Sequence, residues 1–346
     1  MMWNCFVLDK ELGGGIKEFS LIEDSSINIP YPQDSVTDLA PSSGILAFSM
    51  KVQRLRNKVL MYTKSAAKNM DHWWKEGSQF WEYEKQVRAL TATIPPELQF
   101  NAANLSARPT FSASQYFLRT HLQAYHVFCD LYRVSLPGLK ESSPQILLDM
   151  VPQETLAHFR KECIATSIVI ARTIKENLLY LNSRELNLWT LRFLSECTRL
   201  FISAARHHLY DLLNMTLDEL GRLIESCLSM MYNYSEQTDH CTLHRETIGY
   251  LVRGCIQCDL KMYVPQKCMA FSTSRAYEEN DGNKPALILS AHHPLSAVPE
   301  ISQANSASSP TQEAMYFLPQ FSFHDFDDIN SLLYQAPLDF SNPPDQ

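Results

Sequence analysis

Apolar residues through the first three quarters of the chain recur every three or four positions, which is the spacing of one helix face. No segment alternates apolar and polar residues convincingly enough to indicate a strand hairpin. The sequence therefore predicts an all-α, multi-helix domain with about seven long helices. We expect helices at Ile45–Tyr62 and Asp71–Leu90, one opened by a cap at Ser112 or Ser114 and closed before Pro137, one from Pro152 to Leu178, one from Leu188 to Leu212, and two at about 216–232 and 240–257.

Charge divides the chain into two parts. The 346 residues carry 30 Lys+Arg and 38 Asp+Glu, a formal net charge of −8. The last base is Lys284, and the 62 residues after it hold seven acids, so residues 1–284 hold 31 acids against 30 bases. Eight prolines and nine serines also lie in this tail, a composition that buries too little apolar area to offset chain entropy. We expect a helical domain over 1–265 and a disordered linker and acidic tail over 266–346.

Several classes of protein are disfavoured by composition. The negative charge argues against wrapping nucleic acid through bulk positive charge. No apolar run is long enough for a transmembrane helix, and the first residues lack the features of a signal peptide. Nine scattered cysteines suit free thiols in a reducing compartment. These features predict a soluble intracellular chain with no membrane partner.

Four short stretches of the sequence resemble segments of a known protein family. They are Trp3-Asn4-Cys5-Phe6-Val7-Leu8-Asp9-Lys10, Ile27-Asn28-Ile29-Pro30, the run Phe117 to His126, and Cys129-Asp130-Leu131-Tyr132-Arg133 followed by Leu136-Pro137-Gly138. In this order they resemble the middle regulatory region of fungal zinc-cluster (Zn2Cys6-type) transcription factors, over about residues 1–260. The positions that carry the family pattern are Trp3, Asp9, His121, Tyr125, Cys129 and Arg133.

The resemblance implies a nuclear transcription regulator of RNA polymerase II genes, with or without shuttling to the cytoplasm, and not an enzyme. The family binds DNA through an N-terminal module of six cysteines that holds two zinc ions, and this sequence contains no such spacing. We therefore expect a chain that begins part-way through the regulatory domain, holds no cofactor of its own and reaches DNA only indirectly. It would pair as a homo- or heterodimer with a member of the family. The alternative is a DNA-binding-deficient interaction protein that pairs with a full-length factor and modulates it.

The tail contains apolar side chains between acids. Acids keep such a segment open in water and leave its apolar anchors free to dock into a groove of a coactivator or mediator-type protein. We expect an activation segment over residues 315–340, and the alternative is a strip that packs on the body or has no role. The expected anchors are Phe317, Phe321, Phe323, Phe326, Ile329, Leu332 and Leu333.

Each of the remaining candidate functional residues also has a purely structural explanation. Cys255-x2-Cys258 has metal-ligand spacing, but buried structural cysteines are the favoured interpretation. His207-His208 is read as a helix-face pair, and the aromatic group Trp73, Trp74, Trp81 and Tyr83 either lines a pocket or forms core. A window without acids, Leu39 to Met70, is read as a solvated helix face rather than a phosphate-binding face. Its bases are Lys51, Arg54, Arg56, Lys58, Lys64 and Lys68. The sequence therefore predicts no catalytic, cofactor or metal site.

Overall fold

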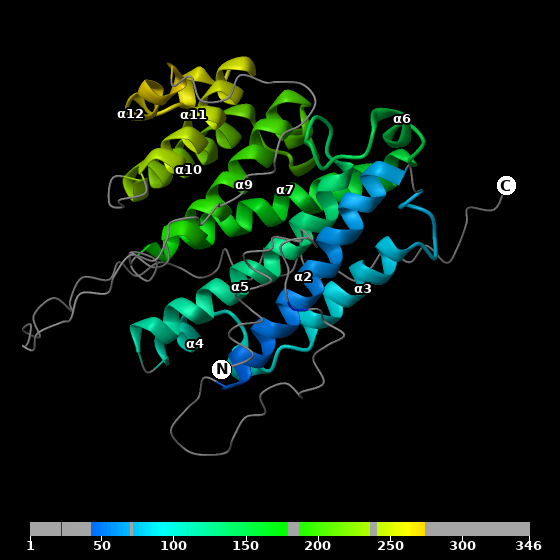
Figure 1. The fold of residues 1–346 in the computed structure, drawn as a ribbon. Helices are drawn as coiled ribbons and strands as arrows, with labels where there is room; N and C mark the ends of the chain where they lie inside the picture. Colours follow the sequence, from blue (N-terminus) through cyan, green and yellow to red (C-terminus); the bar gives the residue numbers. More distant parts are fainter. Residues whose placement is uncertain are drawn as a thin grey trace, which may run out of the picture. The chain divides into compact units, whose positions relative to one another are not determined.

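The computed structural model describes Ile22 and residues 43–69, 72–108, 110–178, 187–235 and 241–273. Contacts along the chain separate two compact units, Met1–Glu278 and Glu279–Gln346, and all the described residues belong to the first unit. Trp3, Asp9 and the seven tail anchors lie outside the described residues. Within the described ranges the chain is helical without any strand, so the predicted all-α fold is confirmed (Figure 1).

Seven helices of the described part are fourteen residues or longer, as predicted. Shorter helices connect them: η3 (Pro96–Leu98), α4 (Ala102–Ser106), η4 (Arg133–Ser135), α6 (Gln145–Leu148), η5 (Leu209–Leu213), η6 (Lys261–Tyr263), α12 (Gln266–Met269) and η7 (Ala270–Thr273). The long helices are α2 (Ser43–Asn69), α3 (Gln79–Ala92), α5 (Phe111–Tyr132), α7 (Gln153–Glu176), α9 (Asn187–Arg206), α10 (Leu217–Ser235) and α11 (Cys241–Gln257).

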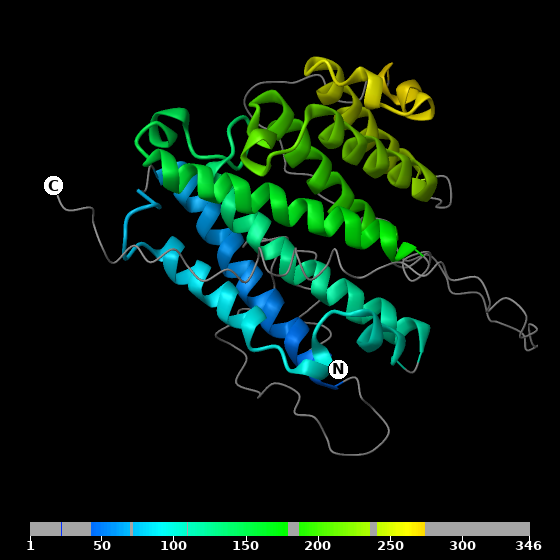
Figure 2. The same cartoon turned by 180° about the vertical axis from the view of Figure 1, so that it is seen from behind.

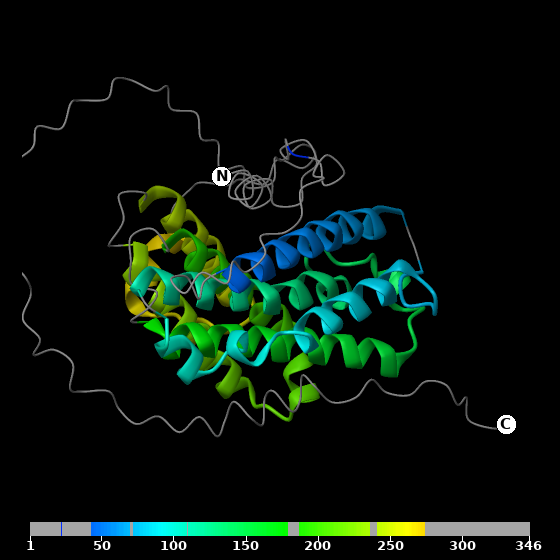
Figure 3. The same ribbon diagram turned by 90° about the horizontal axis from the view of Figure 1, so that it is seen from below.

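Helix α5 lies at the centre of the bundle. It packs against α2 and α3 on one side and α7 on the other, and α9 packs on α7 (Figure 1). Helices α10 and α11 pack on α9, and α12 and η7 pack on α11 at the far side of the bundle (Figure 2). The view from below shows α2, α3, α5 and α7 running side by side along much of their length (Figure 3). A side chain on α5 is therefore enclosed by helices distant in sequence.

Aromatic side chains fill the core between α3, α5 and α7. The ring of Phe80 lies 4.8 Å from that of Phe159, and Trp73 lies 5.1 Å from Phe80. Trp73 is 1% exposed, and its indole nitrogen donates a hydrogen bond of 2.8 Å to Ser143 Oγ. Buried aromatic rings contribute large apolar areas to a core. Trp73 and Tyr83 are therefore core residues, whereas Trp74 and Trp81 are half-buried.

Two predicted helix starts are wrong. Residues 72–78 form turns instead of the first two turns of a helix, and α3 begins only at Gln79. Gly77 has a φ of 78°, a left-handed conformation that breaks a helix and that glycine adopts without steric cost. Neither Ser112 nor Ser114 caps α5, because Thr110 accepts the hydrogen bond from the backbone N–H of Ala113 at 3.2 Å.

Other predicted boundaries are confirmed or refined. Pro152 stands at the start of α7, and Thr216 and Glu219 form a reciprocal capping box at the start of α10. The helix expected to run to Leu212 ends at Arg206 instead. His208 has a φ of 53°, so the chain leaves the helix there and continues as η5.

Candidate functional site

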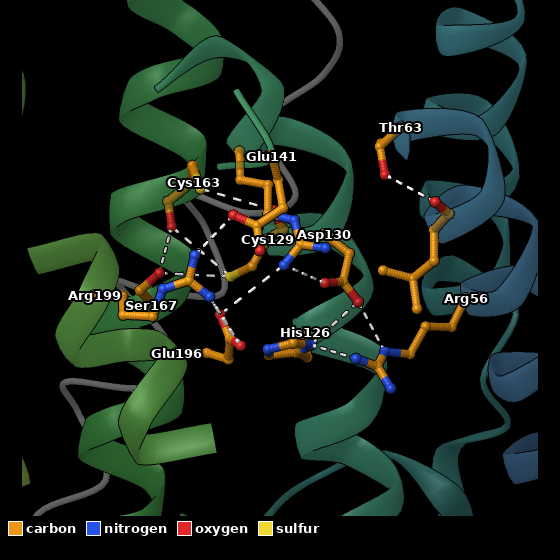
Figure 4. Close-up of polar contacts among 12 residues, drawn as sticks. Arg56, Thr63, His126, Cys129, Asp130, Glu141, Cys163, Ser167, Glu196 and Arg199 are labelled. Atoms are coloured by element: carbon orange, nitrogen blue, oxygen red, sulfur yellow. Dashed lines mark hydrogen bonds and ion pairs between the residues drawn. The ribbon is translucent and has the colours of Figure 1, made fainter. Parts of the chain in front are cut away.

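A network of ionic side chains crosses the centre of the bundle (Figure 4). It is buried around Asp130 and half-buried around Glu196. Its members come from α2, α5, α9, η4 and the loop between η4 and α6, so it joins parts of the chain that are far apart in sequence. Charged groups enter a protein interior only when they are paired or hydrogen-bonded. The members are Arg56, His126, Asp130, Arg133, Glu141, Glu196 and Arg199.

Asp130 is the centre of the first half of this network. Its side chain is 1% exposed, and its Oδ2 accepts a hydrogen bond of 2.7 Å from Arg56 Nε on α2. Its Oδ1 lies 3.2 Å from Arg133 Nη1. These two atoms form an ion pair but are not aligned for a hydrogen bond. Burial alone raises the pKa of Asp130, but Arg56, His126 and Arg133 together hold it well below its usual range. The carboxylate is therefore ionised, and its ion pair with Arg56 links α2 to α5.

His126 lies between Arg56 and Asp130. Its Nδ1 is 3.2 Å from Asp130 Oδ2 and 3.3 Å from Arg56 Nη2. Burial lowers the pKa of His126 more than Asp130 raises it, so the ring is neutral. A neutral ring makes one of the two bonds at a time: Nδ1–H donates to Asp130, or an unprotonated Nδ1 accepts from Arg56.

The second half of the network is built around α9. Arg199 donates to Glu141 Oε2 at 2.7 Å and to Glu196 Oε2 at 3.0 Å. Arg133 Nη1 approaches Glu196 Oε2 at 3.9 Å and so joins the two halves. Burial raises the pKa of Glu196, but Arg199 and Arg133 outweigh it and bring the value to about 2. Glu196 is therefore also ionised in the folded protein.

Two thiols lie beside the network. Cys129 Sγ is 3.5 Å from Ser167 Oγ, and its neighbour Cys163 is fully buried on α7. Burial, together with the contact to Cys129, raises the pKa of the Cys163 thiol well above its ordinary value. A thiol that does not ionise is a poor nucleophile and metal ligand. These two cysteines act as small packing residues between α5 and α7.

The family-pattern positions on α5 and η4 form a single row. His121, Tyr125, Cys129 and Arg133 follow one another at intervals of four, and all four are buried. His121 donates from Nε2 to the carbonyl oxygen of Leu98 at 2.8 Å, and burial lowers its pKa to about 4. Only Arg133 of the row takes part in the ionic network. The others pack α5 against its neighbours.

The sequence predicts that the basic window, Leu39 to Met70, is a solvated helix face. This prediction is wrong for Arg56, and it agrees with the exposure of Lys51, Lys58 and Lys64. Arg56 is 3% exposed and ion-paired, whereas those three lysines are exposed. The signal that could have found Arg56 is its position in the apolar stripe between Val52 and Val59, both fully buried. Asp130 lies four residues after His126 in the same stretch of sequence, which places both on one helix face.

The cysteines with metal spacing lie apart from this network. Cys255 is buried, and the Sγ of the partly exposed Cys258 accepts from Arg206 Nε at 3.3 Å. Within the described ranges no three His, Cys, Asp or Glu side chains are grouped to hold a metal ion. His208 Nδ1 and Tyr210 Oη lie 3.0 Å apart at the end of α9, and His207 lies against Gly138.

The structure thus defines an all-α bundle whose centre is an ionic network. Curated proteins similar to this chain are fungal transcription factors. The Zn(2)-C6 fungal-type transcription factor FTF2 of Fusarium oxysporum f. sp. lycopersici is 22% identical over 171 residues, which cover 41% of this chain and 16% of that protein. FTF1a of the same organism is 21% identical, with the same coverage of both chains. FTF1c is 20% identical and covered to 18% of its length.

This chain therefore spans less than a fifth of the length of the curated relatives it matches. No protein-family model matches it, and no solved structure matches it. The homology is distant, and the homologues are transcription factors rather than enzymes. In the part of the chain that the structure describes, no helix has the length and apolar character needed to cross a bilayer.

Proposed function

We propose that this protein is a nuclear regulator of RNA polymerase II transcription, with the helical body as a regulatory domain and the acidic tail as an activation segment. The observation that carries the proposal is the homology to fungal Zn(2)-C6 transcription factors. The all-α bundle agrees with the helical regulatory region that the sequence resemblance implies. The name of those relatives refers to a zinc-binding module, and the proposal gives no such module to these residues.

The body is proposed to act through protein contacts. With 31 acids and 30 bases over residues 1–284, it has no excess of positive charge with which to track a phosphate backbone. A homo- or heterodimer partner of the same family would supply the contact with DNA. The tail, from Pro285 to Gln346, carries the acids and the aromatic anchors that a coactivator or mediator-type protein would bind.

Reporter transcription tests the activation half of the proposal. The full chain, residues 1–284 and residues 285–346 are each fused to an unrelated DNA-binding domain in fungal cells. We expect output from the full chain and from the tail and none from residues 1–284. Replacing Phe317, Phe321, Phe323 and Phe326 by alanine should abolish the output, whereas the control Ile301→Ala, in the tail but outside the 315–340 segment, should leave it intact.

The three parts of the proposal, which are the activation segment, the nuclear role and the dimer partner, fail separately. A silent tail, with all fusions present at equal protein levels, would exclude the activation segment. Localisation of the full chain outside the nucleus under all growth conditions would contradict the regulatory role as a whole. Pull-down of the full chain that recovers no transcription factor of the family would exclude the dimer partner.

A further inference from the structure

The C-terminal end of α11 holds two cysteines that lie one turn apart. Cys255 belongs to the last turn of the helix, and Cys258 directly follows its last residue, Gln257. The backbone N–H of Cys258 donates to the carbonyl oxygen of Cys255 at 3.1 Å, and the N–H of Leu260 donates to the same oxygen at 2.9 Å. Asp259 has a φ of 57°, so the helix ends in a Schellman motif. This motif fixes the position of Cys258 relative to Cys255.

The geometry of this turn suits a bond between the two sulfurs. The backbone bond from Cys258 to Cys255 joins residues three apart, which is the pattern of a 3₁₀ turn, and side chains at that spacing eclipse one another. Side chains three apart on an ordinary helix have Cβ atoms about 5–6 Å apart, and a tighter turn shortens that distance toward the roughly 3.5–4.5 Å of a disulfide. Cys258 also lies where the chain leaves the helix, so its backbone can adjust without breaking the helix.

The two thiols differ in exposure and in partners. Cys258 is partly exposed, and its Sγ accepts a hydrogen bond of 3.3 Å from Arg206 Nε at the end of α9. Arg206 Nη2 also donates to Gln257 Oε1 at 3.4 Å, which holds the guanidinium beside the sulfur. Cys255 is fully buried, and burial, together with the neighbouring Cys258, raises the pKa of its thiol to about 12. An oxidant from solution therefore meets Cys258 first, and Cys255 reacts only with a group held beside it.

We propose that Cys258 is a site of oxidation by hydrogen peroxide and that Cys255 resolves the product into a disulfide at the end of α11. Redox-sensing cysteines are accessible to solvent, lie beside a cation and have a second cysteine within reach. Cys258 combines these three properties. The site stands on the described geometry and goes beyond the proposed function. A regulatory use of the oxidation would rest on that function.

The reaction balances in two steps. The Cys258 sulfur attacks one oxygen of the peroxide, the O–O bond breaks, and the products are a sulfenic acid and water. The Cys255 sulfur then attacks the sulfenic sulfur, the S–O bond breaks, and the hydroxyl leaves as water with the thiol proton of Cys255. The peroxide takes up two electrons, and each sulfur gives up one. The disulfide turns the Cys258 sulfur toward Cys255, so Arg206 loses an acceptor that links α9 to α11.

Peptide mapping of the purified full chain tests the site. The chain is treated with equimolar hydrogen peroxide, its remaining thiols are alkylated in denaturant, and it is digested with trypsin. Cleavage after Arg253 and Lys261 releases a peptide, residues 254–261, that contains Cys255 and Cys258 and no other cysteine. We expect this peptide to lose two hydrogen atoms and to carry no alkyl group. Treatment with dithiothreitol before alkylation should restore two alkyl groups.

Two variants and a matched control separate the roles of the residues. Cys255→Ala should stop at the sulfenic acid of Cys258, which a 1,3-diketone traps. Arg206→Met should form the disulfide roughly fivefold more slowly, because the sulfur anion loses a charge-assisted hydrogen bond. Arg222→Met, at an arginine whose side chain is 74% exposed, is the control and should react at the rate of the wild type.

Three results would overturn the proposal. They are a peptide 254–261 that carries two alkyl groups after peroxide treatment, a disulfide that joins Cys258 to any cysteine other than Cys255, and oxidation of the fully buried Cys197 as fast as that of Cys258. A rate unchanged in Arg206→Met would exclude the arginine from the site. The reporter fusions do not depend on any of these results.

Discussion

Replacing Asp130 by asparagine should destabilise the protein more than any surface charge change. Asparagine keeps the shape of aspartate but removes the negative charge that Arg56 and Arg133 share at 2.7 and 3.2 Å. Both arginines are then left buried without that partner. Removing one member of a buried ion pair typically costs about 3–5 kcal/mol. A typical domain has a total stability of about 5–15 kcal/mol, so the loss is a large share of it.

The control is an ion pair of similar geometry at the surface. Asp218 and Arg222 lie 2.8 Å apart, but their side chains are 54% and 74% exposed. Exposed pairs contribute about 0.2–1 kcal/mol, because water screens the charges. Asp218→Asn should therefore cost at most about 1 kcal/mol. The comparison isolates burial, since both changes replace an arginine-bound aspartate by asparagine.

Urea unfolding of the full chain, followed by far-ultraviolet circular dichroism, measures the difference. With a slope of about 3 kcal/mol per molar urea, Asp130→Asn should lower the midpoint by roughly 1–2 M. Equal midpoints for Asp130→Asn and Asp218→Asn would refute the reasoning that the network is a buried, low-dielectric one.

Two further predictions concern packing and pH. A Cβ added at Gly249 would lie 2.6 Å from the backbone oxygen of Phe271, so Gly249→Ala should lower the stability by about 1–3 kcal/mol despite alanine's better helix propensity. Gly254→Ala, where the nearest atom is 3.4 Å away, should be neutral or stabilising by up to about 1 kcal/mol, and thermal unfolding compares the two. Burial lowers the pKa of His121 to about 4, so the unfolded chain binds its proton first as pH falls and stability decreases between about 6.5 and 4. In His121→Gln the loss of stability between about pH 6.5 and 4 should be smaller by about 3 kcal/mol. A loss equal to that of the wild type would contradict the assignment of this pH dependence to His121.

The presence of the long helices could be predicted from this sequence, because the periodicity of apolar residues is a local property. All seven long helices stand where the pattern placed them, with errors at their ends. The turn before α3 was missed because Trp73 and Trp74 look like helical apolar positions, although Gly77 in the left-handed region stops the helix. Thr110 was missed as a cap because two serines nearby were equally suitable by type. Such choices depend on backbone geometry that residue types do not fix.

The ionic network could not be predicted, because its partners are brought together only by tertiary packing. Arg56 and Asp130 are 74 positions apart, and Arg199 and Glu141 are 58 apart. In the sequence, Arg56 was one of six bases in a window without acids, where a solvated face is the ordinary expectation. Its place in the stripe of Val52 and Val59 was the one local sign of burial. The family resemblance included the segment that forms α5, but it did not indicate which charged side chains of that segment are buried in the core.

A cluster of buried charges is an expensive way to hold helices together. Well-packed apolar residues of the same volume often give equal or greater stability, by about 1–4 kcal/mol. Breaking such a network by removing one partner still costs about 3–5 kcal/mol, because the remaining charge stays buried without a partner. Arg56 Nε and Asp130 Oδ2 lie 2.7 Å apart only when α2 and α5 pack in this register. The pair therefore selects this packing of the two helices over other packings rather than adding to the stability of the fold.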